Sequence, residues 1–157
     1  MRRKTRRTLV AATAASAVLL APGHAAGALF FVFKPTSAVP GQRVELRTPW
    51  TPAGFSPRRT AKPLGRPVTL YLVRNEVASL VRTRSDPRVS RIGSVRLDRK
   101  NRGVMGFTVP RLEPGPYAIA YSCPDCAAYS FGRTFFSGAV GPDTSPRYRG
   151  RMLLTIR

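Results

Sequence analysis

The stretch from Gly103 to Cys126, GVMGFTVPRLEPGPYAIAYSCPDC, constrains the fold more than any other part of the chain. Its apolar residues alternate with small or polar ones in two runs. The alternating residues are Met105, Phe107, Val109, Tyr117, Ile119, Tyr121 and Cys123. A period of two residues is typical of a β-strand with one buried face. The sequence therefore predicts two strands here, with the rest of an all-β protein packed around them.

A short Leu-Glu-Pro-Gly segment joins the two predicted strands, and we expect them to bend back on each other there. Pro114 restricts the backbone, and Gly115 supplies the conformational freedom that a corner needs. The order Leu112, Pro114, Gly115, Tyr117 resembles the tyrosine corner of immunoglobulin-like and fibronectin-type sandwiches. In that corner the Tyr hydroxyl bonds back to the corner backbone. A simple Pro-Gly hairpin turn is the alternative.

Other short apolar runs, separated by Pro, Gly and charged residues, predict the remaining strands. The run 67–74 is apolar on both faces and is expected to lie centrally in its sheet. Further strands are expected at 29–33, in the run that ends at Leu46 with Val44 and Leu46 facing inward, at 89–97, near 133–136, and over Met152, Leu154 and Ile156. Residues 75–84 have apolar residues at helical spacing, and a charged hairpin turn is expected at 98–103. Seven or eight strands predict one Greek-key β-sandwich.

The N-terminal 28 residues have the layout of an export signal. A basic run at 2–7 precedes an apolar run at 9–21, and the small residues Ala26, Gly27 and Ala28 follow. The apolar run is shorter than the roughly 20 residues that span a bilayer. We therefore expect a signal peptide at 1–28, cleaved near Ala28, a single immunoglobulin-like domain at 29–157, and a secreted or cell-surface protein. An uncleaved N-terminal anchor is the alternative.

The only histidine, His24, lies within the predicted signal peptide. The remaining domain would have no imidazole, which excludes Ser-His-Asp and Cys-His catalysis and His-ligated metal sites. No other recognisable catalytic set is present, so we expect a non-enzymatic protein with no cofactor. Asp98 and Asn101 suggest a calcium site, but the surrounding basic residues oppose binding of a dication.

Two cysteines lie close together in the motif Cys123-Pro124-Asp125-Cys126. In an oxidising, exported setting an even pair usually forms a structural disulfide. A redox-active dithiol is a second interpretation, although reactive CxxC motifs lie at the start of a helix and this one follows a strand. Half of a metal site is a third interpretation, which would need Asp125 or a second copy of the chain for its other ligands.

The charge of the chain is strongly basic, with 27 Lys and Arg against 7 Asp and Glu and a net charge of +20. Such a surface attracts polyanions, so anionic cell-wall polymers or a membrane surface are possible partners, while no specific nucleic-acid motif is present. The candidate contact residues are Arg58, Arg59, Arg99, Lys100, Arg102, Arg147 and Arg149. A solvated surface that reflects genome composition is the alternative. Aromatic residues near Arg133, including Phe135 and Phe136, suit base stacking but are more often a buried face.

Residues 36–157 resemble exported bacterial immunoglobulin-like or fibronectin-like β-sandwich domain proteins of uncharacterised function. The resemblance rests on PGQRVEL at 40–46 and on the pattern D-x-x-x-x-G, FTVP, L-x-PG-x-Y between Asp98 and Tyr117. The Cys–Trp–Cys spacing of antibody domains is absent. The resemblance implies a Greek-key sandwich that serves as a secreted, non-enzymatic structural or binding module at the cell surface or in the cell wall. A polyanion-binding protein and a thiol-disulfide redox protein are the alternatives.

Overall fold

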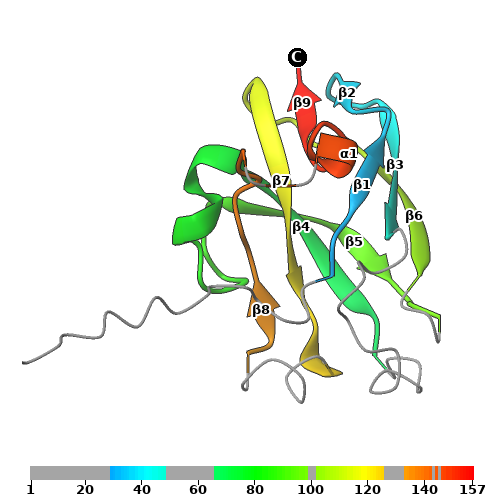
Figure 1. Ribbon diagram of the computed structural model, residues 1–157, viewed down its shortest axis with the longest axis vertical. Coiled ribbons are helices and arrows are strands. Elements are labelled where there is room, and N and C mark those ends of the chain that lie inside the picture. The colour runs from blue at the N-terminus through cyan, green and yellow to red at the C-terminus, as the bar shows by residue number, and fades with distance from the viewer. Residues whose placement is uncertain (1–28, 49–65, 99–101, 126–132, 143, 145) are drawn as a thin grey trace, which may run out of the picture.

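A computed structural model of the chain describes residues 29–48, 66–98, 102–125, 133–142, 144 and 146–157. This part of the chain is mostly β-structure (Figure 1). The elements are β1 (Val32–Lys34), β2 (Ser37–Ala38), β3 (Arg43–Thr48), β4 (Val68–Arg74), the 3-10 helix η2 (Asn75–Leu80), β5 (Val89–Val95), β6 (Gly103–Thr108), β7 (Gly115–Ser122), β8 (Phe135–Phe136), α1 (Pro146–Arg149) and β9 (Leu154–Ile156). The signal peptide predicted at 1–28 lies outside the described residues.

The strands form two sheets in a sandwich-like arrangement (Figure 1). The smaller sheet has the order β1-β3-β6, and the larger has the order β2-β9-β7-β4-β5, with β8 paired to β7. The β2–β9 pair is parallel, and the other described pairs are antiparallel. Because β4 lies between β7 and β5, the prediction that 67–74 is a central strand is confirmed.

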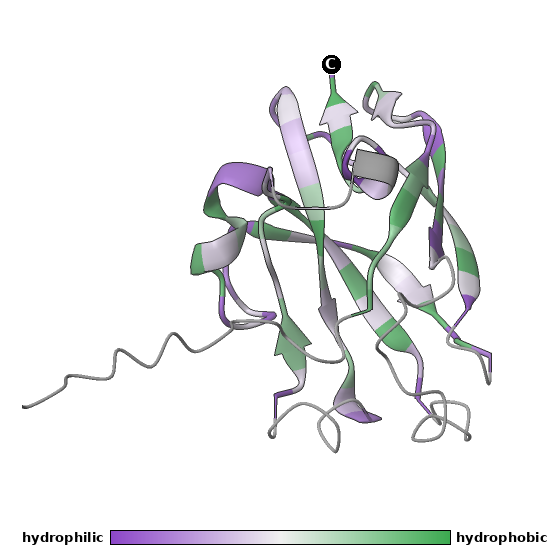
Figure 2. Cartoon of the chain, in the orientation of Figure 1, coloured by the Kyte–Doolittle hydropathy of each residue, from purple (hydrophilic) through white to green (hydrophobic). Residues whose placement is uncertain are grey.

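The larger hydrophobic core lies between the two sheets. Val44 and Leu46 of β3 are fully buried in it, as their alternation predicted. Phe107 of β6 and Tyr117 of β7 are 5% and 4% exposed, so the inward faces predicted for both strands are confirmed. In Figure 2, green hydrophobic segments lie along β1, β4 and β6, among white and purple ones. Burial of these side chains favours the folded state because it removes apolar surface from water.

A second, smaller core covers the outer face of the larger sheet. It joins the other face of β4 and β7 to η2 and to the segment around β8. Its buried members are Tyr71, Val73, Ala78, Val81, Ala118 and Ala120. This second core explains why β4 is apolar on both faces, and η2 contributes Ala78 to it.

The connectivity corrects two expectations. The turn expected at 98–103 does not join two paired strands, because β5 pairs with β4 while β6 pairs with β3 in the other sheet. The strands β6 and β7 likewise belong to different sheets, so the corner between them carries the chain across the sandwich and does not fold a ribbon back on itself. Alternation determines which face of a strand is buried, but it contains no information about which strand is its neighbour.

Several boundaries also differ from the prediction. The first strand begins at Val32 instead of Leu29, and β5 ends at Val95, although Leu97 beyond it is still buried. The short β2 lies in a stretch that was expected to be a connection, and the described ranges therefore hold nine strands instead of seven or eight. Elements of two or three residues leave too short a pattern for periodicity to detect.

The corner between β6 and β7 is held by side chains from two elements. The Tyr117 hydroxyl donates a hydrogen bond to the Glu113 carbonyl oxygen at 2.9 Å, which is the back-bond that the tyrosine-corner resemblance implies. Burial raises the pKa of Tyr117, so the hydroxyl keeps its proton and remains a donor. Arg74 of β4 forms ion pairs with Glu113 at 2.7 Å and with Glu76 at 2.9 Å. The corner is therefore tied both to β7 and to the neighbouring strand, and the side chain of Leu112 packs against the main core.

Candidate functional site

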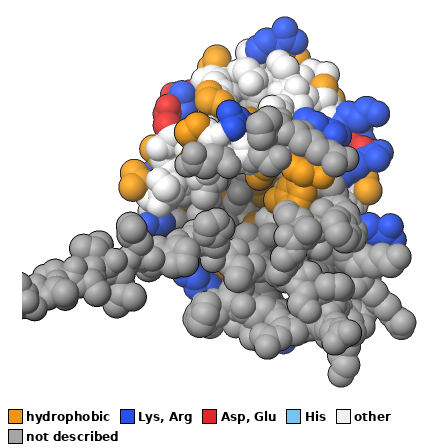
Figure 3. All heavy atoms as spheres, in the orientation of Figure 1, with side chains coloured by type: hydrophobic (Ala, Val, Ile, Leu, Met, Phe, Trp, Pro, Cys, Tyr) orange, Lys and Arg blue, Asp and Glu red, His pale blue; other side chains and the backbone are white. Residues whose placement is uncertain are grey.

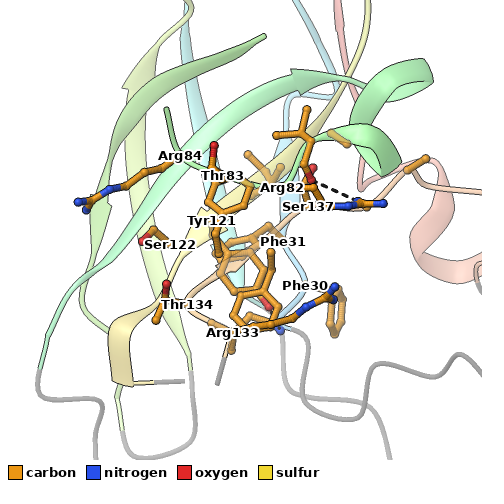
Figure 4. Close-up of a pocket in the computed structure, with 18 of the residues that line it drawn as sticks. Phe30, Phe31, Arg82, Thr83, Arg84, Tyr121, Ser122, Arg133, Thr134 and Ser137 are labelled. Carbon is orange, nitrogen blue, oxygen red and sulfur yellow. Dashed lines mark hydrogen bonds between the residues drawn. The ribbon is translucent and has the colours of Figure 1, made fainter. Parts of the chain in front are cut away.

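A cavity of about 730 Å³ opens beside β7 and β8. Its walls come from the segment 29–31 before β1, the segment 81–85 after η2, the strands β7 and β8, and the residues that follow β8. Figure 4 shows Phe31 and Tyr121 in the middle of the labelled side chains, with Arg82, Arg84 and Arg133 around them. Small-molecule sites are usually clefts of roughly 300–1,000 Å³, so this cavity has the size of a ligand site.

The floor of the cavity is aromatic. The Tyr121 ring stacks on Phe136 with a centroid distance of 4.9 Å, and Phe31 lies 5.6 Å from Tyr121. The Tyr121 hydroxyl accepts a hydrogen bond from the backbone N–H of Leu29 at 2.8 Å. Burial raises the pKa of Tyr121 far above its ordinary value, so this hydroxyl stays neutral. The floor is therefore an uncharged surface that suits an apolar group.

The rim of the cavity is basic. Three arginines line it, and no acidic side chain is among its described lining residues. Arg84 and Arg133 are exposed and form no ion pair or hydrogen bond with residues in the described ranges, whereas Arg82 donates to the Ser79 carbonyl. Within the described ranges, these two guanidinium groups are available to an anion, which each can bind through paired N–H donors.

One wall of the cavity is anchored to η2 by polar contacts. The Val140 backbone N–H donates to Asn75 Oδ1 at 2.7 Å, and Asn75 Nδ2 donates to the Val140 carbonyl at 3.4 Å. Ser137 Oγ donates to the Ala78 carbonyl at 2.8 Å. These bonds tie the segment 137–140 to the helix on which it packs, so the cavity is shaped before any ligand arrives.

A turn next to Arg84 contains the acidic residue Asp86, but its charge is already paired. The Asp86 carboxylate accepts hydrogen bonds from the backbone N–H, Nε and Nη2 of Arg88 at 2.7–2.9 Å. These bonds lower the pKa of Asp86 from 3.8 to about 2. The Asp86 carboxylate is therefore paired with Arg88 and not with Arg84.

This pairing predicts a pH dependence of stability. Because the folded pKa of Asp86 is the lower one, its contribution is present above about pH 3.8 and is lost as the pH falls through about 2. We expect the wild type to melt at a higher temperature than the Asp86→Asn variant at pH 6, and the difference to shrink between pH 4 and pH 2. Thermal unfolding by circular dichroism measures it. Asparagine keeps the acceptor for the Arg88 N–H, so a difference that does not change with pH would contradict the role of ionisation.

The arginines and lysine proposed from the sequence as polyanion contacts do not form one described site. Arg58, Arg59, Arg99 and Lys100 lie outside the described residues. Arg102 pairs with Asp98 at 2.9 Å, in the connection between β5 and β6. Arg149 lies in α1 with Arg147, and its guanidinium donates to the carbonyls of Thr144 and Pro142.

The cysteine motif is described only in part. Cys123 follows β7 and is 1% exposed, while Cys126 lies outside the described residues, so the disulfide between them remains a prediction. The Asp125 carboxylate accepts a hydrogen bond from the Arg66 backbone N–H at 2.8 Å. The described residues contain no group of three side chains suited to holding a metal ion. Asn101 of the calcium hypothesis is also outside the described ranges, and Arg102 binds the Asp98 carboxylate.

The sequence indicates only part of the cavity. The aromatic residues beside Arg133 suit stacking or a buried face, and in the structure Phe135 and Phe136 are half-buried and line the cavity. Arg84, Phe31 and Tyr121 were not predicted as site residues, because they come from three separate segments that only the fold brings together. The one local signal is a basic stretch at 82–91, which by itself is indistinguishable from a solvated surface.

No protein-family model matches the chain, and no curated protein sequence matches it. Within the described ranges, no helix has both the length and the apolar character needed to cross a bilayer.

Proposed function

We propose that this protein is an exported, non-enzymatic binding module with a Greek-key immunoglobulin-like fold, and that its ligands are anionic components of the cell surface or cell wall. The strand order supports the fold. In immunoglobulin-like domains, strands A, B and E share one sheet and strands C, F and G the other. The strands β1, β3 and β6 match the first set in chain order, and β4, β7 and β9 match the second. The corner before β7 matches the tyrosine corner before strand F.

The observation that carries the proposed function is a cavity that is lined by arginines and has no acidic residue among its described lining residues. Arg84 and Arg133 have no partner in the described part of the chain. Figure 3 shows blue basic side chains at several places on one face of the molecule, with few red acidic ones between them. A positive surface attracts an anion over a distance, and a concave cationic site then holds it. Attraction and binding of the anion both depend on charge and shape and involve no chemical reaction, which agrees with a non-enzymatic role.

The test is retention on immobilised anionic polymer, with heparin as the probe. We expect the wild type to bind at low salt and to elute steeply between about 50 mM and 200 mM salt. The double variant Arg84→Gln/Arg133→Gln should elute at lower salt than the wild type. Salt-independent flow-through of the wild type would refute anion binding.

A matched control separates the cavity from net charge. The double variant Arg91→Gln/Arg111→Gln removes the same charge from two exposed arginines that do not line the cavity. It should elute later than the cavity variant, close to the wild type. An equal shift in both variants would assign the retention to net charge alone.

A thiol redox function is less well supported than binding. A catalytic thiolate must be accessible to its substrate, and Cys123 is 1% exposed. We propose instead a structural disulfide between Cys123 and Cys126, in a protein exported by the signal at 1–28. Mass spectrometry of the exported protein would determine its N-terminus and the state of both cysteines. Two free thiols, or an N-terminus at Met1, would contradict this part of the proposal.

A further inference from the structure

We infer that the cavity binds a single-chain amphiphilic anion, in which one phosphate or carboxylate group is attached to an apolar chain. This inference rests on the proposed anion-binding function and adds the chemical class of the ligand. The cavity combines an apolar floor with a cationic rim. A purely polar ligand would contact only the rim.

The floor requires an apolar partner. It is formed by apolar and aromatic side chains from four segments, namely Leu29, Phe31, Ile119, Tyr121, Phe136 and Met152. Water in contact with such a lining is displaced favourably by an apolar group. Inorganic phosphate or a sugar polymer would leave this surface unused, because neither carries an apolar chain.

The rim requires an anionic head group. In Figure 4, Arg84 and Arg133 lie on opposite sides of the labelled cluster and their guanidinium groups point away from each other, so one of the two would hold the head group; Thr83 and Thr134 also line the cavity. Guanidinium groups bind phosphate and carboxylate oxygens through paired N–H donors. A cationic head group on the same chain would be repelled, since no described lining residue is acidic.

The apolar floor is recessed, so we expect the chain of a ligand to enter the cavity and do not expect the floor to insert into a membrane. Phe31 and Tyr121 are each 4% exposed, so the apolar floor is recessed and cannot be pushed into a bilayer. The large apolar side chains that are most exposed in the described ranges are Val39, Leu80 and Val104, and none of them lines the cavity. A monomeric amphiphile can insert its apolar chain into the recessed cavity. Lipids in a bilayer keep their chains inside the membrane and present only their head groups to the protein.

Isothermal titration calorimetry with alkyl phosphates below their critical micelle concentrations tests this inference. We expect decyl phosphate to bind more tightly than octyl phosphate by about fourfold for each additional buried methylene. Decyltrimethylammonium and inorganic phosphate should each bind at least about tenfold more weakly than decyl phosphate, because each lacks one of the two contacts. These comparisons use the unmodified protein, so they do not depend on whether a variant folds.

Variants then locate the site. Arg84→Gln/Arg133→Gln should weaken decyl phosphate binding by about 10- to 100-fold, since the charge-assisted contact to the head group is lost whichever of the two arginines makes it. The control Arg91→Gln/Arg111→Gln should bind like the wild type. Equal losses in the two double variants would overturn the assignment of the head group to the cavity rim.

The outcomes distinguish this inference from the proposed function. Heparin retention that depends on Arg84 and Arg133, together with alkyl phosphate binding that is independent of chain length, would overturn the amphiphile and leave anion binding intact. Equal binding of decyl phosphate and decyltrimethylammonium would also overturn it. Binding to vesicles of phosphatidylglycerol without binding of monomeric decyl phosphate would assign the surface to a membrane instead. No binding of any anion would refute both proposals.

Discussion

Replacement of Phe107 by alanine should lower the free energy of unfolding by about 3–5 kcal/mol. Phe107 is 5% exposed in the core between the sheets, and its ring centroid lies 6.5 Å from that of Phe33. The substitution removes a buried ring, and the space that it leaves is bounded by strands that are hydrogen-bonded in register and cannot collapse onto it. Urea unfolding followed by circular dichroism would measure the change.

The control lies in the same strand. Val104 of β6 is 59% exposed, so Val104→Ala should change the free energy of unfolding by no more than about 0.5 kcal/mol. The two variants differ in which face of β6 they alter. Similar losses at both positions would contradict the placement of Phe107 in the core and of Val104 at the surface.

The second large effect is expected at Gly115, which begins β7 at the corner. Its φ of +145° lies in a region that residues with a side chain rarely adopt. A Cβ at this position would also lie 3.1 Å from Arg74 Nη2. We expect Gly115→Ala to lower the free energy of unfolding by about 1–3 kcal/mol, measured by urea unfolding.

Two comparisons identify the cause of this loss. Gly138 has no heavy atom within 4 Å of an added Cβ and no φ in the unfavourable region, so Gly138→Ala should leave stability nearly unchanged. Gly115→Ala can also be made in an Arg74→Ala background, which removes the close contact but not the backbone strain. A loss that persists there would confirm that φ is responsible, and a loss that disappears would assign it to the contact with Arg74.

The faces of the strands could be predicted well from the sequence. Val44 and Leu46 of β3 and Tyr117 and Tyr121 of β7 all face the main core, as their alternation indicated. The corner could be predicted as well, because a Pro-Gly pair followed by Tyr117 is a local feature. The functional site could not be predicted in the same way. The sequence indicated only one part of the cavity, the aromatic residues beside Arg133.

The sequence alone determined which side chains of β3, β6 and β7 face the main core, because alternate residues of a strand lie on the same face. Burial of Ala118 and Ala120 on the other face of β7, under the second core, was decided by the tertiary structure. The sequence also determined the excess of positive charge and the position of the cysteine pair. Only the tertiary structure decided that β6 and β7 lie in different sheets, and that Arg84 and Arg133 line one cavity with Phe31. Hydrogen bonds between strands and contacts between distant segments are not local properties of the chain, so no pattern within one segment encodes them.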